Sequence, residues 1–146
     1  MVPVSTYVPA NIWIVGEAGP AWVAGMVLCN PDHSLEYQSC VYNSPGGGWA
    51  FVAPQPPDPQ GCITIQGQNF SFDVPMVFPW RIATVTYHAA VDQSIDDLFL
   101  MGPEGGVLTD GGTVFFDNLD TVVGQVQIGI TSVEETNWGA VKNLFR

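Results

Sequence analysis

Positive charge is scarce in this sequence. Only three of its 146 residues are Lys or Arg, against 14 Asp and Glu, so the formal net charge is −11. The first cation is Arg81, and only Lys142 and Arg146 come after it. A chain without a basic patch cannot neutralise phosphates or approach anionic lipid. Nucleic acid is therefore excluded as a partner.

Charged residues of either sign are also few, at 12% of the chain, about half the usual share. No apolar run reaches the roughly 18 residues of a membrane span, and we expect none. The N-terminus has no basic segment followed by an apolar one, so a secreted form would be mature or truncated. A lysine-poor surface rich in Thr, Gln, Asn and Gly favours an extracellular, cell-surface location.

Groups for catalysis are equally rare. His33 and His88 are the only histidines, and we expect them in a turn and on a partly solvated strand face, as structural or surface residues. The sequence contains no GxSxG, HExxH or phosphate-loop motif. We therefore expect no enzyme activity, no catalytic residue and no cofactor, apart from a candidate calcium ion discussed below.

What the sequence does contain is a series of short β-rich runs with a period of two, separated by Gly, Pro, Asn and Asp. Its length fits one domain, and the pattern predicts a single all-β antiparallel sandwich. Residues 22–42 are expected to form a hairpin that turns at 30–34. Residues 44–48 and 54–60 should be irregular and bracket a short edge strand. The expected strands are 2–8, 12–15, 22–29, 35–42, 49–53, 62–67, 82–90, 98–101, 113–116 and 121–130.

The two ends of the chain are expected to differ from the sandwich of residues 12–132. Residues 1–11 form an N-terminal strand or arm that a neighbouring subunit could take up in exchange. Residues 133–146 form a tail with a short helix, in which Trp138, Val141, Leu144 and Phe145 share one face. A helix this short must dock, either on its own sandwich or on a neighbouring subunit.

Two segments resemble a known family. Residues 24–36 (AGMVLCNPDHSLE) are similar to the strand, Asn-Pro turn and Leu-Glu strand near the front of cohesin-like domains. Residues 81–87 (RIATVTY) resemble a later strand of the same family. The resemblance implies a jelly-roll-like sandwich of about nine strands that binds a protein partner or polysaccharide through a flat sheet face. The two Pro/Gly segments and the terminal helix depart from the family's pattern and argue against a conventional dockerin-binding role.

The three cysteines lie at positions 29, 40 and 62. Strand alternation places Cys40 and Cys62 on outward faces, where they could form a disulfide across the sheet surface. Cys29 is then left as a small buried hydrophobe. The spacings match no zinc pattern.

Acidic residues cluster in the segment VDQSIDD. Asp92, Asp96 and Asp97 there could supply several oxygens to calcium. The alternative is a solvated loop tip that prevents edge pairing.

The aromatic residues also allow two interpretations. Trp49, Trp80, Trp138 and Phe145 are candidate binding or interface residues, and Trp49 and Trp80 are expected to be the most exposed of the tryptophans. They could stack on sugar rings, or they could fill the core and a subunit interface.

Two hypotheses about function follow. The first is an extracellular structural protein that self-assembles as a homo-oligomer or polymer into a filament or surface layer. The second is a monomeric carbohydrate-binding or cohesin-type adhesion module, which binds polysaccharide or a protein partner.

Overall fold

The computed structural model describes residues 6–31, 35–89, 94–128 and 141–145. Within these ranges the chain consists of strands joined by turns and loops, with no helix and so no membrane-spanning one. The strands are β1 (Tyr7–Ile14), β2 (Ala21–Cys29), β3 (Leu35–Tyr42), β4 (Ala50–Phe51), β5 (Cys62–Gln68), β6 (Trp80–Ala89), β7 (Ser94–Thr109), β8 (Gly112–Phe115), β9 (Thr121–Ile128) and β10 (Val141–Phe145).

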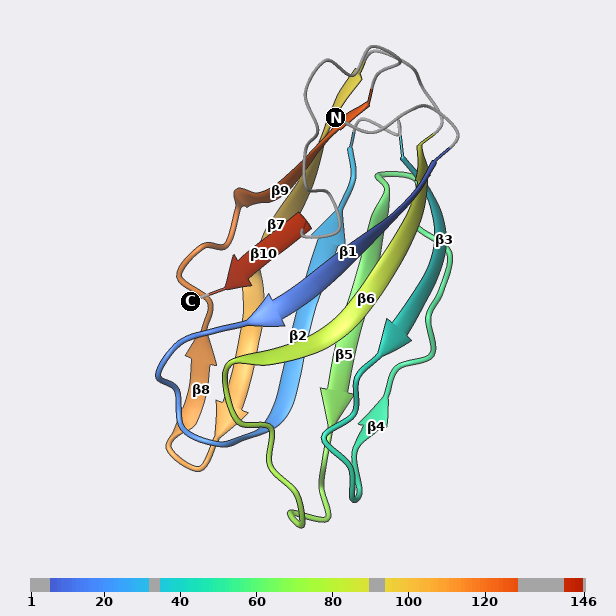
Figure 1. The fold of residues 1–146 in the computed structure, drawn as a ribbon. Coiled ribbons are helices and arrows are strands. Elements are labelled where there is room, and N and C mark those ends of the chain that lie inside the picture. Colours follow the sequence, from blue (N-terminus) through green and yellow to red (C-terminus); the bar gives the residue numbers. More distant parts are fainter. Residues whose placement is uncertain (1–5, 32–34, 90–93, 129–140, 146) are drawn as a thin grey trace.

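The strands form two sheets that pack face to face (Figure 1). The four-stranded sheet has the order β10-β1-β6-β3, and the six-stranded sheet has the order β4-β5-β2-β7-β8 with β9 also paired to β7. Neighbouring strands are antiparallel, except for the parallel pair β1 and β10. The predicted all-β antiparallel sandwich is therefore confirmed.

Alternation along the strands creates the core. In β1 every second residue from Val8 to Ile14 is buried, and β6 follows the same period from Ala83 to Ala89. Successive side chains of a strand point to opposite faces, so one apolar row per strand meets the facing sheet. The largest fully buried side chains come from both sheets and from the loop before β6: Ile12, Leu28, Ile65, Met76, Ile82, Leu98, Leu100, Val8 and Val85.

The expected hairpin of residues 22–42 is wrong. β2 pairs with β5 and β7 in one sheet, whereas β3 pairs with β6 in the other. The segment after Cys29 therefore crosses between the two layers. Its Asn-Pro sequence stops β2 as expected, but turn residues specify a change of direction and not the strand that pairs next.

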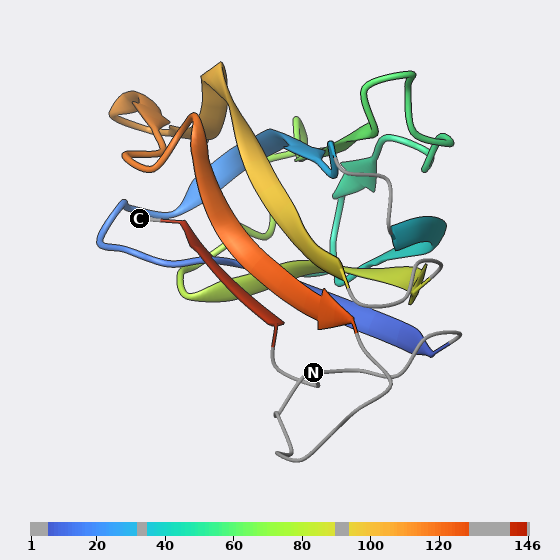
Figure 2. The same cartoon turned by 90° about the horizontal axis from the view of Figure 1, so that it is seen from above.

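The expected C-terminal helix is also wrong where the structure describes it. Residues 141–145 form β10, which pairs in parallel with β1 from Ala10 to Ile14. Figure 2 shows β10 beside β9, so it lies where the edges of the two sheets meet. A strand here uses backbone groups at the edge of β1, whereas a helix of about ten residues would be marginal. The rest of the tail lies outside the described residues.

The sandwich also begins earlier in the chain than residue 12, where the sequence predicted its start. Residues 7–11, expected in an exchangeable arm, belong to β1 and pair with β6 of the same chain. Residues 1–5 lie outside the described part. The irregular character of residues 44–48 and 54–60 is confirmed, and β4 is an edge strand as expected.

Candidate functional site

The candidate site lies on the outer face of the six-stranded sheet. In β2 the side chains of Ala24, Met26 and Leu28 point into the core, so Val23 and Val27 point outward. In β5 the same alternation turns Thr64 and Gln66 outward. This face therefore combines apolar side chains at its centre with uncharged polar ones beside them.

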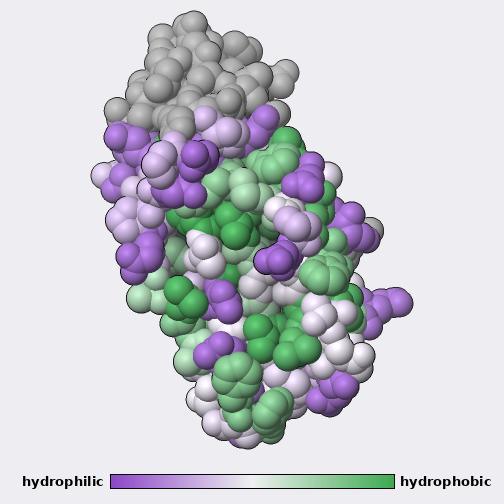
Figure 3. Space-filling view, turned by 180° about the vertical axis from the view of Figure 1, so that it is seen from behind, coloured by the Kyte–Doolittle hydropathy of each residue, from purple (hydrophilic) through white to green (hydrophobic). Residues whose placement is uncertain are grey.

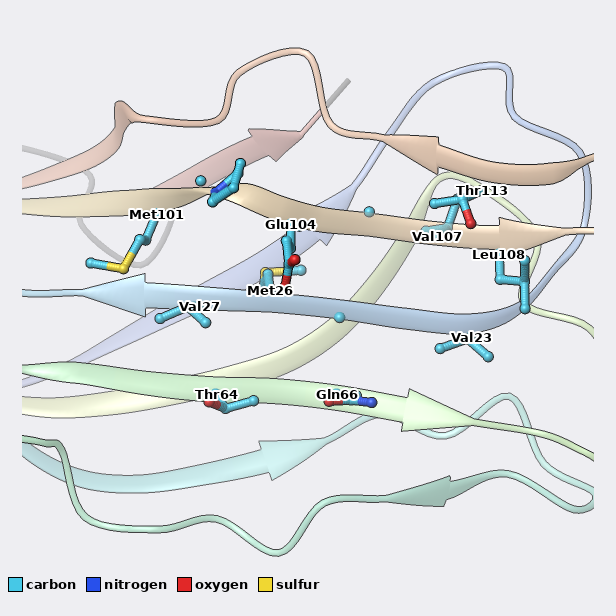
Figure 4. A pocket seen from close by; sticks show the side chains of 15 residues that line it. Val23, Met26, Val27, Thr64, Gln66, Met101, Glu104, Val107, Leu108 and Thr113 are labelled. Carbon is cyan, nitrogen blue, oxygen red and sulfur yellow. The ribbon is translucent and has the colours of Figure 1, made fainter.

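A hollow of about 480 Å³ lies on this face, between β5, β2, β7 and β8 (Figure 4). We call it the β7 hollow; among its lining residues are Val23, Val27, Thr64, Gln66, Met101 and Leu108. Met101 and Leu108 remain 40% and 37% exposed, although both are large and apolar. Figure 3 shows apolar side chains gathered over this face, with polar residues around them. Exposed apolar surface rimmed by polar residues is typical of an interaction site.

One wall of the β7 hollow is a bulge in β7. Gly25 of β2 pairs with Gly106, while Val27 pairs with Met101, so residues 102–105 lie opposite the single residue Met26. Extra residues bend a strand away from its neighbour. The bulge carries Glu104, an exposed residue that also lines the hollow.

The loop that leads to β9 holds the bulge in place. Gly102 donates its backbone N–H to Oδ1 of Asp120 at 2.8 Å, and Phe116 donates its N–H to the carbonyl of Gly105 at 3.0 Å. A Cβ on Gly105 would lie 2.8 Å from Leu119. A side chain at this position would therefore force the Leu119 side chain to shift.

A second hollow, of about 330 Å³, adjoins the first. We call it the strap hollow, because residues 52–58 form one side of it, including Val52, Pro56 and Asp58. Thr64 and Gln66 line both hollows and so form the ridge between them. Neither lining contains Lys, Arg or His, and each contains one acidic residue, Glu104 or Asp58.

Asp58 is fixed by its own turn. Its Oδ1 accepts the backbone N–H of Gln60 and the N–H of Cys62, each at 2.9 Å. Two backbone donors on one oxygen hold the carboxylate at the start of β5. This rigid placement gives the strap hollow a negative group in a defined position.

The tryptophans expected to be exposed are not. Trp49 is buried, and its Nε1–H donates to the carbonyl of Val74 at 2.6 Å. Trp80 is half-buried, and its Nε1–H donates to the carbonyl of Asn43 at 2.8 Å. Both rings pack against the core, where the hydrogen bond satisfies the indole nitrogen. Neither provides a platform for stacking on sugars.

Asp73 holds the loop around Trp49. Its carboxylate accepts hydrogen bonds from Nδ2 of Asn69 at 2.7 Å, from the N–H of Gly48 and from the N–H of Val74. These donors, above all the Asn69 amide, lower the pKa of Asp73 below its usual value. The Asp73 carboxylate therefore stabilises this loop, and it does not line either hollow.

The expected disulfide between Cys40 and Cys62 is also wrong. Cys62 is bonded to Cys29, its direct cross-strand neighbour in the β2–β5 pair. Cys40 lies in β3, in the other sheet, and is a free thiol. Burial raises its pKa to about 11. Alternation assigned Cys62 to the outer face, but Cys62 and Ile63 are both buried at the start of β5.

The acidic cluster is only partly described. Asp92 lies outside the described residues, and Asp96 and Asp97 belong to β7, where they pair with Val126 and Gln125 of β9. In the described part of the chain no three His, Cys, Asp or Glu side chains gather closely enough to hold a metal ion. The calcium site remains a prediction.

Three other expected residues can now be placed. Trp138 and His33 lie outside the described residues, and Phe145 pairs through its backbone with Ile14. His88 lies on the outer face of the four-stranded sheet, with its Nδ1 2.9 Å from Oε1 of Glu36 and its ring 5.1 Å from that of Tyr7. His88 thus connects β3, β6 and β1 at the surface. This agrees with the expectation that it is a structural or surface residue on a partly solvated strand face.

Comparisons with known proteins support the fold. No family model matches the chain, and no curated protein matches it. Among solved structures, it is similar to a cohesin module from a family 33 glycoside hydrolase of Clostridium perfringens ATCC13124. The TM-score is 0.62 at 12% identity, over 88% of this chain and 89% of that one. The chain therefore has a cohesin-like fold, as the sequence resemblance implied.

Proposed function

We propose that this chain is a non-catalytic, extracellular, cohesin-type module that binds a protein partner through the outer face of its six-stranded sheet. The observation that carries the proposal is the β7 hollow, which brings the exposed Met101 and Leu108 together with the half-buried Val23 and Val27. An apolar surface of this kind is stabilised when a partner removes it from water. The Cys29–Cys62 disulfide supports an oxidising, extracellular environment.

A pair of matched variants tests this proposal. Val27→Asp places a charge in the β7 hollow, and Val41→Asp places the same charge on exposed β3 of the other sheet. A phage-displayed library of random dodecapeptides is panned on the wild-type protein, and each enriched clone is then tested on both variants. Circular dichroism and urea unfolding check that both variants fold.

The proposal predicts clones that bind the wild type and Val41→Asp but lose at least tenfold in affinity for Val27→Asp. A charge in an apolar contact leaves an unpaired group after desolvation, so the loss should be large. The proposal is wrong if the clones bind both variants equally, or if the library yields no clone specific for the folded protein.

A second candidate function is a self-assembling subunit of a filament or surface layer. Its specific support is β8, the last strand of its sheet, where Val114 and Phe115 are exposed. An exposed edge strand with apolar side chains can pair with another chain. Each chain has a formal net charge of −11. This assembly should therefore need salt or calcium to screen the repulsion between subunits.

Electron microscopy and sedimentation velocity across salt and calcium concentrations test the second candidate. Ordered polymers that Phe115→Lys abolishes would support it. A wild-type protein that stays monomeric in every condition would contradict it.

A further inference from the structure

We propose that the outer face of the six-stranded sheet selects a protein segment that carries Lys or Arg side chains next to apolar ones. This inference rests on the proposed function and adds the chemistry of the partner. Its basis is the charge of the two hollows, which is negative on both sides of the Thr64 and Gln66 ridge.

Glu104 supplies the charge of the β7 hollow. It is exposed, it lines the hollow, and it is the only charged residue of that lining. Figure 4 shows its side chain between β7 and β2, near the apolar centre of the face. The bulge that carries it is held by Asp120 and Phe116. Glu104 is therefore presented from a backbone whose position is set before any partner arrives.

Asp58 supplies the charge of the strap hollow. Its Oδ1 is occupied by the N–H groups of Gln60 and Cys62. Asp58 is exposed and lines the strap hollow, so its carboxylate is a fixed anion that a partner can reach. A segment that lies across the ridge would meet Glu104 on one side and Asp58 on the other.

Nothing in either lining compensates these carboxylates. Among the described residues, Arg81 lies on β6 and Lys142 on β10, both strands of the other sheet. An apolar partner without cations would desolvate two anions and leave them unpaired, at a cost to binding. A partner with suitably placed Lys or Arg pairs them and also gains faster association.

The same charges exclude two other occupants. A second copy of the chain brings a net charge of −11 and no cation on this face, so carboxylates would meet carboxylates. An acidic peptide or polysaccharide would be repelled in the same way. A basic amphipathic segment satisfies both the apolar side chains and the carboxylates.

The experiment uses the same dodecapeptide library together with protein variants in which one carboxylate is replaced by lysine. Glu104→Lys reverses the charge in the β7 hollow, and Glu17→Lys makes the same change in net charge at an exposed loop position between β1 and β2. Val27→Asp is included as well, because it tests whether the clones bind the outer face of the six-stranded sheet at all. Clones selected on the wild type are sequenced, and their affinities are measured at low and high salt.

The inference predicts that wild-type clones are enriched in Lys and Arg, lose about tenfold or more in affinity for Glu104→Lys, and keep their affinity for Glu17→Lys. Replacing the basic residues of a clone by Glu should restore part of its binding to Glu104→Lys. Raising the salt concentration should weaken wild-type binding.

Two different failures can be told apart. Clones that are sensitive to Val27→Asp but indifferent to Glu104→Lys would overturn the charge selection and leave the proposed function standing. Clones that are indifferent to Val27→Asp would overturn the proposed function itself, and the charge selection with it.

Discussion

The backbone N–H of Gly102 donates a 2.8 Å hydrogen bond to Oδ1 of Asp120, which ties the β7 bulge to the loop before β9. Asp120 has a φ of 61°, in the left-handed region that non-glycine residues rarely adopt. Its own N–H donates to the carbonyl of Leu100 at 2.7 Å. A Cβ on residue 102 would lie 2.5 Å from Oδ2 of Asp120. The two residues therefore constrain each other.

Replacing Gly102 by Ala should lower the free energy of unfolding by about 1–3 kcal/mol, because the new methyl group has no room beside the Asp120 carboxylate. Urea unfolding measures the change. The matched control is Gly19→Ala, since a Cβ at position 19 meets nothing within 4 Å. The control should be close to neutral.

A double variant checks the cause. In Gly102→Ala/Asp120→Gly the methyl group gains the space of the lost side chain, and glycine tolerates the positive φ at position 120. The loss of stability should be smaller than the sum of the two single effects. Strictly additive losses would show that the two residues are not coupled.

The Cys29–Cys62 disulfide should contribute about 2–4 kcal/mol to stability, because it closes a loop with a sequence separation of 33. The variant Cys29→Ala/Cys62→Ala should show this loss in urea unfolding, and reduced wild-type protein should resemble the variant. Cys40→Ala, which leaves the disulfide intact, is the control and should lose less. Peptide mapping without reductant would contradict the structure if it recovered Cys40 joined to Cys62.

Local pattern predicted several strands well, but it divided β1 (Tyr7–Ile14) between two expected strands and gave no strand's partner. The runs at 22–29, 35–42 and 62–67 all became β2, β3 and β5 nearly as expected. Period two indicates which side chains share a face, and it contains no information about which strand lies next to which. The hairpin of β2 with β3 and the Cys40–Cys62 pair were wrong for this reason.

The site was harder to predict than the fold. The expected strands at 98–101 and 113–116 left residues 102–112 between them, whereas β7 continues to Thr109. The bulge depends on contacts with Phe116 and Asp120, which lie further along the chain. One sequence feature could have indicated the site. β2 is apolar on both faces, and its outward Val23 and Val27 mark the outer face of the sheet as a surface for contact.

Cys40 should react slowly in the folded protein. Burial raises its pKa to about 11, and only the thiolate attacks iodoacetamide. Near pH 8.5 the native protein should be alkylated about 100-fold more slowly than the protein unfolded in urea, and the native rate should keep rising until about pH 11. A native rate that levels off near pH 9 would contradict this shift.

The same shift makes stability depend on pH. The folded protein holds the Cys40 proton more tightly than the unfolded chain, so the contribution is complete below the unfolded pKa of about 8.5. It is lost as the pH rises through about 11. The difference in unfolding free energy between wild type and Cys40→Ala should therefore shrink over this range. A difference that stays constant would mean that the thiol is not desolvated.

Asp73 should give stability with the opposite dependence on pH. Hydrogen bonds from Asn69, Gly48 and Val74 lower the pKa of its carboxyl in the folded state. The contribution is therefore complete above the unfolded pKa of about 3.9 and is lost as the pH falls through the lower folded value. The stability advantage of wild type over Asp73→Ala should be constant from about pH 7 to 5 and decrease below about pH 4.

Urea unfolding at a series of pH values measures this advantage, with Asp117→Ala as the control. Asp117 is an exposed carboxylate in the turn after β8, so its variant controls for the loss of one negative charge. Because Asp73 also fixes Gly48 next to Trp49, the fluorescence of Asp73→Ala should change already at neutral pH. An advantage that grows as the pH falls would contradict the direction of the shift, since only a raised pKa produces it.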